Sequence, residues 1–425
     1  MKKNSVLNIW LSVPLYAVAV TLICYILFSL SFLFPVKPIL MHMQESADTI
    51  TEEAMYGSWI EGNPSTKNDG WSECIILSMA VCPTEPGAAF KGPLILRTVS
   101  AKGYDNAFEG LNAYVRNPET ETEIGSNNRY WNGFVMVLKA ALMCFSLSEV
   151  RMLFLFVQLS LLCLVVIHMA DSHMNRELIP FMLMIYAINP VTLGMSLKLI
   201  PEYLVMLGGC LFLLCQKEEF LCDRRKMMAA FTVIGTITSF FNMLSFPLIA
   251  LGIPLMIWTW KQNQSSECSV RIFLSSIVSW FAGYMISWAC KWIACTLFTE
   301  DNLIADALLR AGMYHTEGEN YTAVVLRNLE VYNNRFTIAL FAGALLYFAI
   351  LAFRNRRSFP STRQLLNYAV IYGILFLLPF LFFAVMGSAY AYNHHYMAYR
   401  NLVFAITAPV CFVMHLSDPP ETDAN

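Results

Sequence analysis

Charged side chains are scarce in this chain. They make up 14% of its 425 residues, against about 25% in ordinary soluble domains, while 57% of the residues are hydrophobic. This composition excludes an ordinary soluble globular protein, and a mean hydropathy of +0.52 indicates a polytopic membrane protein. An excess of basic residues is also missing, because 28 Lys and Arg face 30 Asp and Glu. The chain therefore lacks the electrostatic footprint of a nucleic-acid partner.

The usual catalytic motifs are missing as well. The sequence has no Walker A, GxSxG or HExxH motif and no CxxC pair in a metal-binding context, so ATPases, serine hydrolases and common zinc enzymes lose their usual sequence support. It also has no repeat of about 20–50 residues, which excludes a solenoid and gives no support to an inverted-repeat transporter. Catalysis, if the chain performs any, must use scattered carboxylates and cations.

Long apolar runs dominate the sequence instead. No charged residue occurs from Asn4 to Val36, which predicts an uncleaved anchor helix at about 8–35. Further apolar runs predict nine more spans, at about 150–170, 179–197, 202–216, 228–241, 243–260, 272–298, 335–353, 365–387 and 400–416. We therefore predict an all-α polytopic membrane protein with about ten transmembrane helices.

Eight spans remain an alternative, because the pattern is interrupted in the middle of the chain. The run 202–216 is short, and Pro190, Pro201 and Glu202 break the apolar pattern around it, as in a broken or re-entrant helix pair. Asn242 falls between two further runs, where a hairpin or a kinked helix fits equally well.

Basic residues predict the orientation of the spans. Lys2 and Lys3 precede the first span, and the rule that cytoplasmic loops carry excess Lys and Arg places the N-terminus inside. The short loops on that side carry Arg176, Lys217, Arg224, Arg225, Lys226, Lys261, Arg271, Arg354, Arg356, Arg357 and Arg363. The short turns on the other side offer only Lys198 and Arg400. Both termini are thus expected in the cytoplasm.

Four regions follow from these spans. Residues 1–35 form the anchor, 36–149 a long extracytoplasmic loop, 150–416 a transmembrane bundle with an outer loop at 299–334, and 417–425 a cytoplasmic tail.

The long loop has two predicted helices. A short amphipathic helix is expected at 72–81, and an interfacial helix at 131–147 with Arg129 and Trp131 at headgroup depth; a re-entrant segment is the alternative for the latter. Cys74 and Cys82 also lie in this loop, and eight helical residues span about 12 Å, so a disulfide between them requires a bend in the helix.

Two acids in the long loop are candidates for chemistry. Asp69 and Glu73 are four residues apart, so a helix that begins by Asp69 carries both on one face. Such a pair could bind a divalent metal ion or supply a general base. The alternative is that Asp69 caps the helix and Glu73 complements its dipole.

Outer-face cations are the complementary candidates. Lys291 lies among aromatic residues near the outer end of its span, where it either binds a phosphate headgroup or extends its ammonium to the interface. His394, His395 and Arg400 lie in the last outer loop, and a guanidinium there suits bidentate phosphate recognition. An interfacial belt that anchors the last span is the alternative.

The layout resembles the GT-C class of polytopic glycosyltransferases, which take a sugar from a polyprenyl-phosphate carrier at the outer leaflet. Four short strings also resemble uncharacterised bacterial membrane proteins of this layout: Arg129-Tyr130-Trp131-Asn132-Gly133, Phe240 to Pro247, Gly283-Tyr284 to Lys291-Trp292, and Tyr399-Arg400-Asn401. The resemblance implies a bacterial plasma membrane, a polyprenyl-phosphate-linked sugar as donor and an envelope or surface glycan as acceptor. The chain departs from the paired acids early in the family's first loop, since that stretch offers only Glu45, Asp48, Glu52 and Glu53.

The resemblance also assigns roles to the candidate residues. Asp69 or Glu73 would act as general base or metal ligand, and Lys291, Arg400 and the pair His394 and His395 would neutralise the carrier phosphate. Arg129 and Trp131 are the remaining candidates for binding the substrate or its phosphate. A flippase or transporter and a polysaccharide polymerase are the competing functions. Transport calls for polar residues deep in the spans, and these are few: Gln158, Thr236, Thr238, Ser239 and Asn242.

Overall fold

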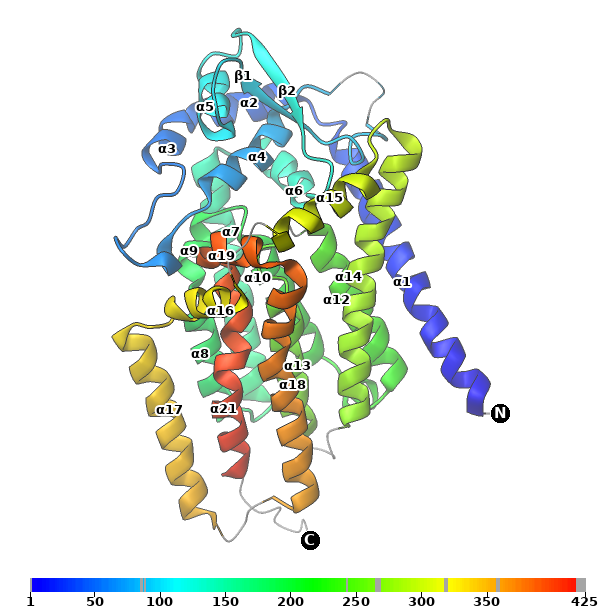
Figure 1. Ribbon diagram of the computed structural model, residues 1–425, viewed down its shortest axis with the longest axis vertical. Helices are drawn as coiled ribbons and strands as arrows, with labels where there is room; N and C mark the ends of the chain where they lie inside the picture. Colours follow the sequence, from blue (N-terminus) through cyan, green and yellow to red (C-terminus); the bar gives the residue numbers. More distant parts are fainter. Residues whose placement is uncertain are drawn as a thin grey trace.

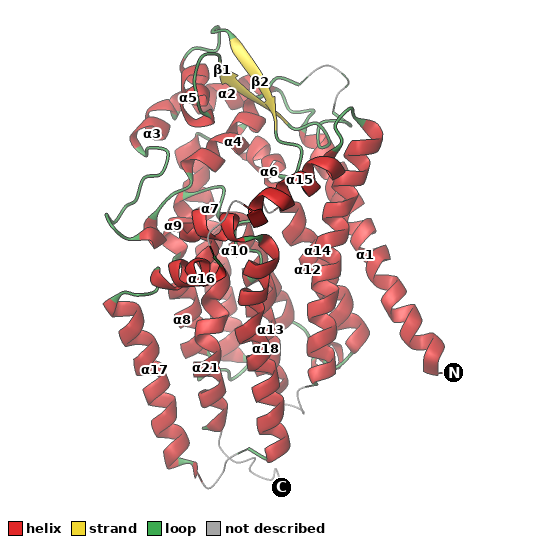
Figure 2. Ribbon diagram, in the orientation of Figure 1, coloured by secondary structure: helices red, strands yellow, loops and turns green. Residues whose placement is uncertain are grey.

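A computed structural model gives the structure of this protein and describes residues 2–84, 87, 89–241, 244–263, 269–316, 320–356 and 360–417. Helix accounts for 74% of it and strand for 3%, which confirms the predicted all-α class. The strands are β1 (Arg97–Ala101) and β2 (Thr122–Ser126), which pair antiparallel with Val99 opposite Ile124. They lie at one end of the molecule, above the helices (Figure 2).

Six helical segments are long and apolar enough to cross a membrane, which supports a multi-pass membrane protein. They are the apolar part Trp10–Ser31 of α1 (Lys2–Ser31), α7 (Leu147–Asp171), α14 (Val270–Phe298), α17 (Arg335–Arg354), α18 (Thr362–Met386), and His395–Leu416, which contains α20 (His395–Ala398), η3 (Tyr399–Leu402) and α21 (Val403–Leu416).

The other four predicted spans are also helical. They correspond to α8 (Leu178–Ile188), α10 (Ile200–Leu214), α12 (Arg224–Phe241) and α13 (Ile249–Asn263). These helices are shorter or less apolar, and they pack inside the bundle, α10 against α13 and α12 against α14. Ten crossings therefore stay a prediction, and six is the number that length and composition support. Asn242 lies outside the described residues, as does the tail beyond Ser417.

The interruption predicted near Pro190 and Pro201 is confirmed. Helix α8 ends at Ile188 because Asn189 takes a left-handed conformation with φ of 58°, and Pro190 then begins α9 (Pro190–Met195). Pro is favoured in a first helical turn, where its missing N–H is not needed, and Pro201 occupies the same kind of position in α10. The chain thus leaves a short non-helical segment, 196–199, between two helices.

Helices of the bundle run along the long axis of the molecule, and the first outer loop folds into a cap at one end (Figure 1). Helix α1 begins, and α21 ends, toward the opposite end. The cap contains α2 (Val36–Glu45), α3 (Ala47–Glu52), η1 (Pro64–Thr66), α4 (Gly70–Val81), α5 (Ala107–Arg116) and α6 (Phe134–Leu142). It has a hydrophobic core of its own, distinct from that of the bundle.

Two expectations for the cap need correction. Helix α4 is not amphipathic, since every residue from Ser72 to Val81 is buried. Helix α6 is short and sits in the interior beside α4, with Trp131 just before it only 2% exposed and Lys139 fully buried. The conditional disulfide does not form either, because Cys74 and Cys82 are both free.

Candidate functional site

Buried polar side chains gather where the cap meets the bundle. Three segments supply them: the loop around η1 that leads into α4, the break between α9 and α10, and the segment that precedes α21. Ser65 links the first segment to α9 and to the third segment, because its carbonyl oxygen accepts hydrogen bonds from Thr192 Oγ1 at 3.0 Å and from Arg400 Nη2 at 3.4 Å. The loop around η1 is thereby held against α9 and against the segment that precedes α21.

Asp69 caps α4, as the alternative prediction held. Its Oδ1 accepts the N–H of Ser72 at 3.2 Å, and the residue is only 1% exposed. Its Oδ2 is buried and accepts no hydrogen bond from the residues that the structure describes. Tyr56 and Tyr396 feel the charge of this carboxylate, and the pKa of Tyr56 is raised first by burial and then by Asp69. The carboxylate is thus only partly used by the fold, through the helix cap and an interaction with Tyr396.

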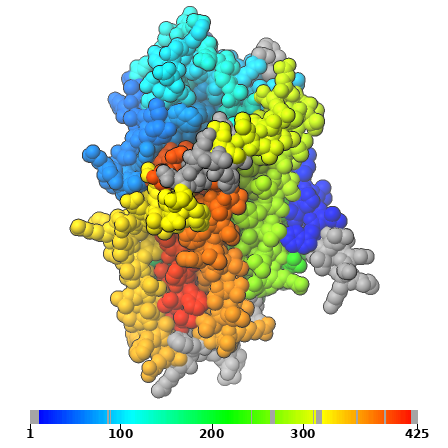
Figure 3. Space-filling model, in the orientation of Figure 1, coloured from blue at the N-terminus to red at the C-terminus, as the bar shows by residue number. Residues whose placement is uncertain are grey.

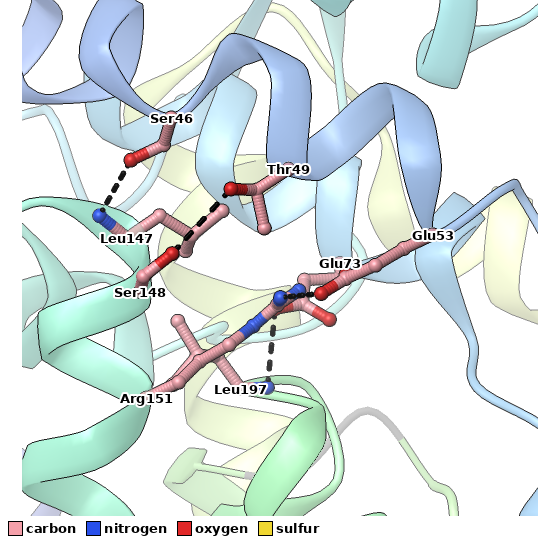
Figure 4. Close-up of polar contacts among 8 residues, drawn as sticks. All are labelled: Ser46, Thr49, Glu53, Glu73, Leu147, Ser148, Arg151 and Leu197. Carbon is pink, nitrogen blue, oxygen red and sulfur yellow. Dashed lines mark hydrogen bonds and ion pairs between the residues drawn. The ribbon is translucent and has the colours of Figure 1, made fainter. Parts of the chain in front are cut away.

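Glu73 joins three segments of the chain through its Oε1 atom. Its Oε1 accepts hydrogen bonds from Arg151 Nη2 at 3.0 Å and from the N–H of Leu197 at 3.3 Å, while Glu53 forms a second ion pair with Arg151 (Figure 4). Because α4, α7 and the segment before α10 meet at this carboxylate, Glu73 holds the cap to the bundle. Its Oε1 atom is therefore used by the structure and is not free to act as a general base.

Arg400 is fully buried and bonds only to neutral groups. Its Nε donates to the carbonyl oxygen of Ile188 at 2.7 Å and its Nη1 to that of Tyr396 at 2.9 Å. The guanidinium carbon lies 4.7 Å from the centre of the Tyr399 ring and 5.3 Å from that of Phe246. No carboxylate of the described chain lies within ion-pair distance of Arg400. The site therefore contains a buried positive charge that no carboxylate contacts directly, with Glu202 the acid whose charge acts on it.

Lys198 and Glu202 enlarge this cluster. Lys198 Nζ donates to Ser245 Oγ at 2.9 Å, and the side chain is 5% exposed. Burial lowers the pKa of Lys198, while the charges of Glu202 and Asp69 act in the opposite direction. The carboxylate oxygens of Glu202 are buried without a hydrogen bond of good geometry in the described part of the protein, although Ser245, Lys198 and Arg400 all interact with this carboxylate. Neither Lys198 nor Glu202 was among the predicted catalytic or phosphate-binding residues.

His394 completes the cluster, which is hereafter called the open cluster: Asp69, Lys198, Glu202, His394 and Arg400. Its Nδ1 is buried and has no hydrogen-bond partner among the described residues. Burial lowers the pKa of His394, Asp69 opposes this, and Lys198 and Lys67 lower the pKa further. The imidazole is accordingly neutral near pH 7, with one ring nitrogen available to a ligand.

His395 faces a different space. Its Nδ1 accepts a hydrogen bond from Arg327 Nε at 3.1 Å. Both residues line a polar pocket of about 490 Å³ together with residues 61–64, Glu330 and 333–334. The cap loop and α16 (Tyr321–Glu330) meet at this face of the molecule, where Figure 3 shows them in blue and yellow. Pro64 lines the pocket and its neighbour Ser65 contacts Arg400, so the pocket and the open cluster lie on two sides of one loop.

Three predicted phosphate-binding residues lie elsewhere. Lys291 is fully buried and donates to the carbonyl oxygens of Pro93 and Leu94, the latter at 3.1 Å, with its ammonium 5.3 Å from the Trp131 ring centre. It neither reaches the interface nor faces Arg400. Trp131 in turn donates to Ser287 of α14 at 2.8 Å.

Arg129 belongs to the same structural contact between the cap and α14. It forms an ion pair with Asp306 of α15 (Leu303–Thr316), at 2.7 and 3.0 Å, and its carbonyl oxygen accepts the indole N–H groups of Trp288 and Trp292. We therefore correct the predicted phosphate site: of its six residues, Arg400 and His394 join Asp69, His395 lines the adjacent pocket, and Lys291, Arg129 and Trp131 fix the cap to α14.

Metal binding has little support from the donor set. Within the described ranges, no group of three or more His, Cys, Asp and Glu side chains converges in a way that could hold an ion.

Known proteins offer no further guide. Comparison with protein-family models, with curated proteins and with solved structures finds no match to this chain.

Proposed function

We propose that this protein is a membrane glycosyltransferase that moves a sugar from a polyprenyl-phosphate-linked donor to a cell-envelope or surface glycan. The resemblance to GT-C enzymes supplies the donor class. One observation carries the proposal: Asp69 keeps a buried, unbonded oxygen in a cluster whose cations, Lys198 and Arg400, have no ion-pair partner in the described chain. Buried charges left without partners are more typical of a functional site than of a structural one.

The proposed reaction uses these groups in complementary roles. Asp69 Oδ2 accepts the proton of an acceptor hydroxyl as its oxygen attacks the anomeric carbon of the donor sugar. The new glycosidic bond forms while the bond from that carbon to the phosphate oxygen breaks, and the electron pair leaves with the phosphate. Arg400 and Lys198 offset the charge on this leaving group, in a site where low solvent access strengthens their effect.

The polar pocket beside the open cluster suits the acceptor. It is lined by Asn63, Asn333, Asn334, Glu330 and Arg327, which offer both donors and acceptors to a hydroxyl-rich molecule. It lies on the same face as the cap, on the predicted outer side. A glycan end in this pocket is separated from the open cluster only by the loop that carries Pro64 and Ser65.

Transport receives less support from the bundle interior. Thr238 donates to the carbonyl oxygen of Ile234 at 2.7 Å and Thr236 to that of Gly283 at 3.3 Å, so these hydroxyls are used by the helices. Gln158 donates to the carbonyl oxygen of Pro190 at 3.1 Å. These polar side chains therefore stabilise helix packing and do not outline a path.

Carbohydrate analysis of cells tests the proposal. Cells with the intact protein are compared with Asp69→Asn and Arg400→Lys cells, and with Lys291→Gln as the matched control outside the open cluster. We expect the first two variants to lose a sugar from envelope polymer while the lipid-linked donor accumulates at the outer leaflet. Accumulation at the inner leaflet would favour a flippase, and unchanged profiles at normal protein levels would refute the site. Repeating the assay on membranes with a chelator tests the possible divalent metal ion.

A further inference from the structure

A second cavity lies on the side of the bundle, farther along α10 than Glu202 of the open cluster. It measures about 630 Å³, within the range of about 300–1,000 Å³ that small-molecule sites occupy. Helices α1, α10 and α12 form its walls, and α11 (Glu218–Leu221) closes one end. Tyr16 and Phe212 line it and remain 45% and 42% exposed, so the cavity is a groove open to the surroundings of the bundle.

The floor of the groove lacks side chains where helices could otherwise fill it. A Cβ atom added at Gly208 would meet nothing within 4 Å, whereas one at the next residue, Gly209, would contact Pro254 and Ile234 at 3.3 and 3.4 Å. Gly209 thus serves close packing between helices, and Gly208 leaves space. Ala229 and Ala230 of α12 continue this lining of small residues.

Charge is confined to one end of the groove. Arg225 and Lys226 are its only charged lining residues among those described; both are exposed, and neither forms an ion pair there. The nearby acid, Asp223, uses its Oδ1 to accept the backbone N–H groups of both residues, at 2.8 and 3.3 Å. Two cations that form no ion pair among the described residues therefore stand in the first turn of α12, Lys226 with its ammonium 5.8 Å from the centre of the Phe220 ring. They lie on the side that the basic loops predict to be cytoplasmic.

We propose that this groove binds one phospholipid of the cytoplasmic leaflet with an anionic headgroup. An acyl chain lies along the apolar walls over Gly208, and the headgroup phosphate lies at Arg225 and Lys226. Basic positions between helices on the cytoplasmic side suit anionic headgroups, and each cation near the surface strengthens such binding. A soluble, polar ligand would not account for the long apolar part of the groove. The bound lipid would fill the space between α1 and the pair α10 and α12.

Native mass spectrometry of the full-length, detergent-purified protein tests the site. Protein with added phosphatidylglycerol is compared with protein with added phosphatidylcholine. We expect one tightly retained phosphatidylglycerol per chain, and its loss in Gly208→Trp, whose ring enters the groove. Gly343→Trp on α17 is the matched control, because a Cβ atom there also meets nothing within 4 Å but the residue lines no described pocket. Equal retention in the two variants would overturn the proposal.

A charge variant tests the headgroup independently of the groove. Arg225→Gln with Lys226→Gln should weaken phosphatidylglycerol binding roughly 30-fold and leave phosphatidylcholine binding unchanged. Arg354→Gln with Arg356→Gln, on another predicted inner loop, is the control and should change neither. Equal affinity of the intact protein for both lipids would refute the anionic specificity. If Gly208→Trp does not fold, Gly208→Leu replaces it, and folding of every variant is checked by its melting temperature.

Discussion

Two sets of buried charges join the cap to the bundle, and they differ in how completely the protein satisfies them. In the first set, Arg129 pairs with Asp306, Arg151 with Glu73 and Glu53, and Lys291 bonds to two carbonyl oxygens. In the second, the open cluster, Asp69 has one unbonded buried oxygen, Glu202 has two, and His394 has an unbonded nitrogen. Glu73 and Lys291 in the first set are as buried as Asp69 and Arg400 in the second, while the pair of Arg129 and Asp306 is partly exposed. Burial alone therefore does not distinguish structural from functional charges.

The free-energy cost explains why this difference is informative. A buried polar group without a partner destabilises a protein by about 1–3 kcal/mol, and more when it is charged. The first set avoids this cost with partners from the chain itself. The open cluster retains several such groups in one place, where a substrate, a ligand or ordered water would complete them. The following predictions test that distinction.

Asp69→Asn should have the largest effect on activity. Asn caps helices as well as Asp does, so the variant keeps the cap on α4 and removes only the charge and the proton acceptor. We expect sugar transfer to fall about 10²–10⁴-fold with little change in melting temperature. Transfer rates from a lipid-linked donor, measured with purified protein in liposomes, check this. A variant that keeps more than a tenth of the rate would exclude Asp69 as the general base.

Arg151→Ala should have the largest effect on stability. It leaves Glu73 and Glu53 without their cation, and breaking a buried ion pair in this way destabilises a protein by about 3–5 kcal/mol. Thermal unfolding in detergent measures the loss. Arg116→Ala is the control, because its ion pair with Asp48 is exposed and should contribute little. Equal melting temperatures for the two variants would contradict the structural role of Arg151.

Which charges have partners within the chain and which do not could largely not be predicted from sequence. Apolar runs located the helices well, because a hydrophobic segment of sufficient length is a local property of the chain. The spacing of Asp69 and Glu73 correctly placed both acids at the start of one helix. Nothing local, however, shows that Arg151, 78 residues beyond Glu73, occupies that carboxylate.

The same limitation explains the misplaced cations. Lys291 and Arg400 look alike in sequence, each a cation near aromatic residues at a predicted outer boundary. Their partners come from segments about 200 residues away, Leu94 in one case and Ile188 in the other. Lys198 was visible only as a charge beside Pro201. Such long-range contacts follow from packing, which hydrophobic periodicity does not encode.

Two lysines, one from each set of charges, allow the functional and the structural role to be compared directly. Lys198→Met should lower transfer by about 10–100-fold with little loss of stability, because the ammonium bonds only to Ser245 and its removal relieves a buried charge. Lys291→Ala should lower the free energy of unfolding by about 1–3 kcal/mol, because the carbonyl oxygens of Pro93 and Leu94 lose their donor. Its transfer rate per folded molecule should be unchanged. Thermal unfolding and sugar transfer are measured for both variants. A loss of stability in Lys198→Met together with a loss of transfer in Lys291→Ala would reverse the functional and structural assignments of the two lysines.

The smallest expected effect is a pH dependence that comes from His394. Burial holds its pKa below the usual value, so below about pH 6.5 the unfolded chain binds a proton that the folded protein resists. This contribution to stability is present above pH 6.5 and is lost as the pH falls toward the pKa of the folded state. Between pH 5 and about pH 7 the melting temperature of the intact protein should thus gain more with rising pH than that of His394→Asn. Exposed His173→Asn is the control.

The measurement stops near pH 7 because burial lowers the pKa of Lys139 to about 8, and its titration would add a second slope. Equal slopes in all three proteins would mean that His394 is already solvated and that the open cluster is less closed than its burial indicates.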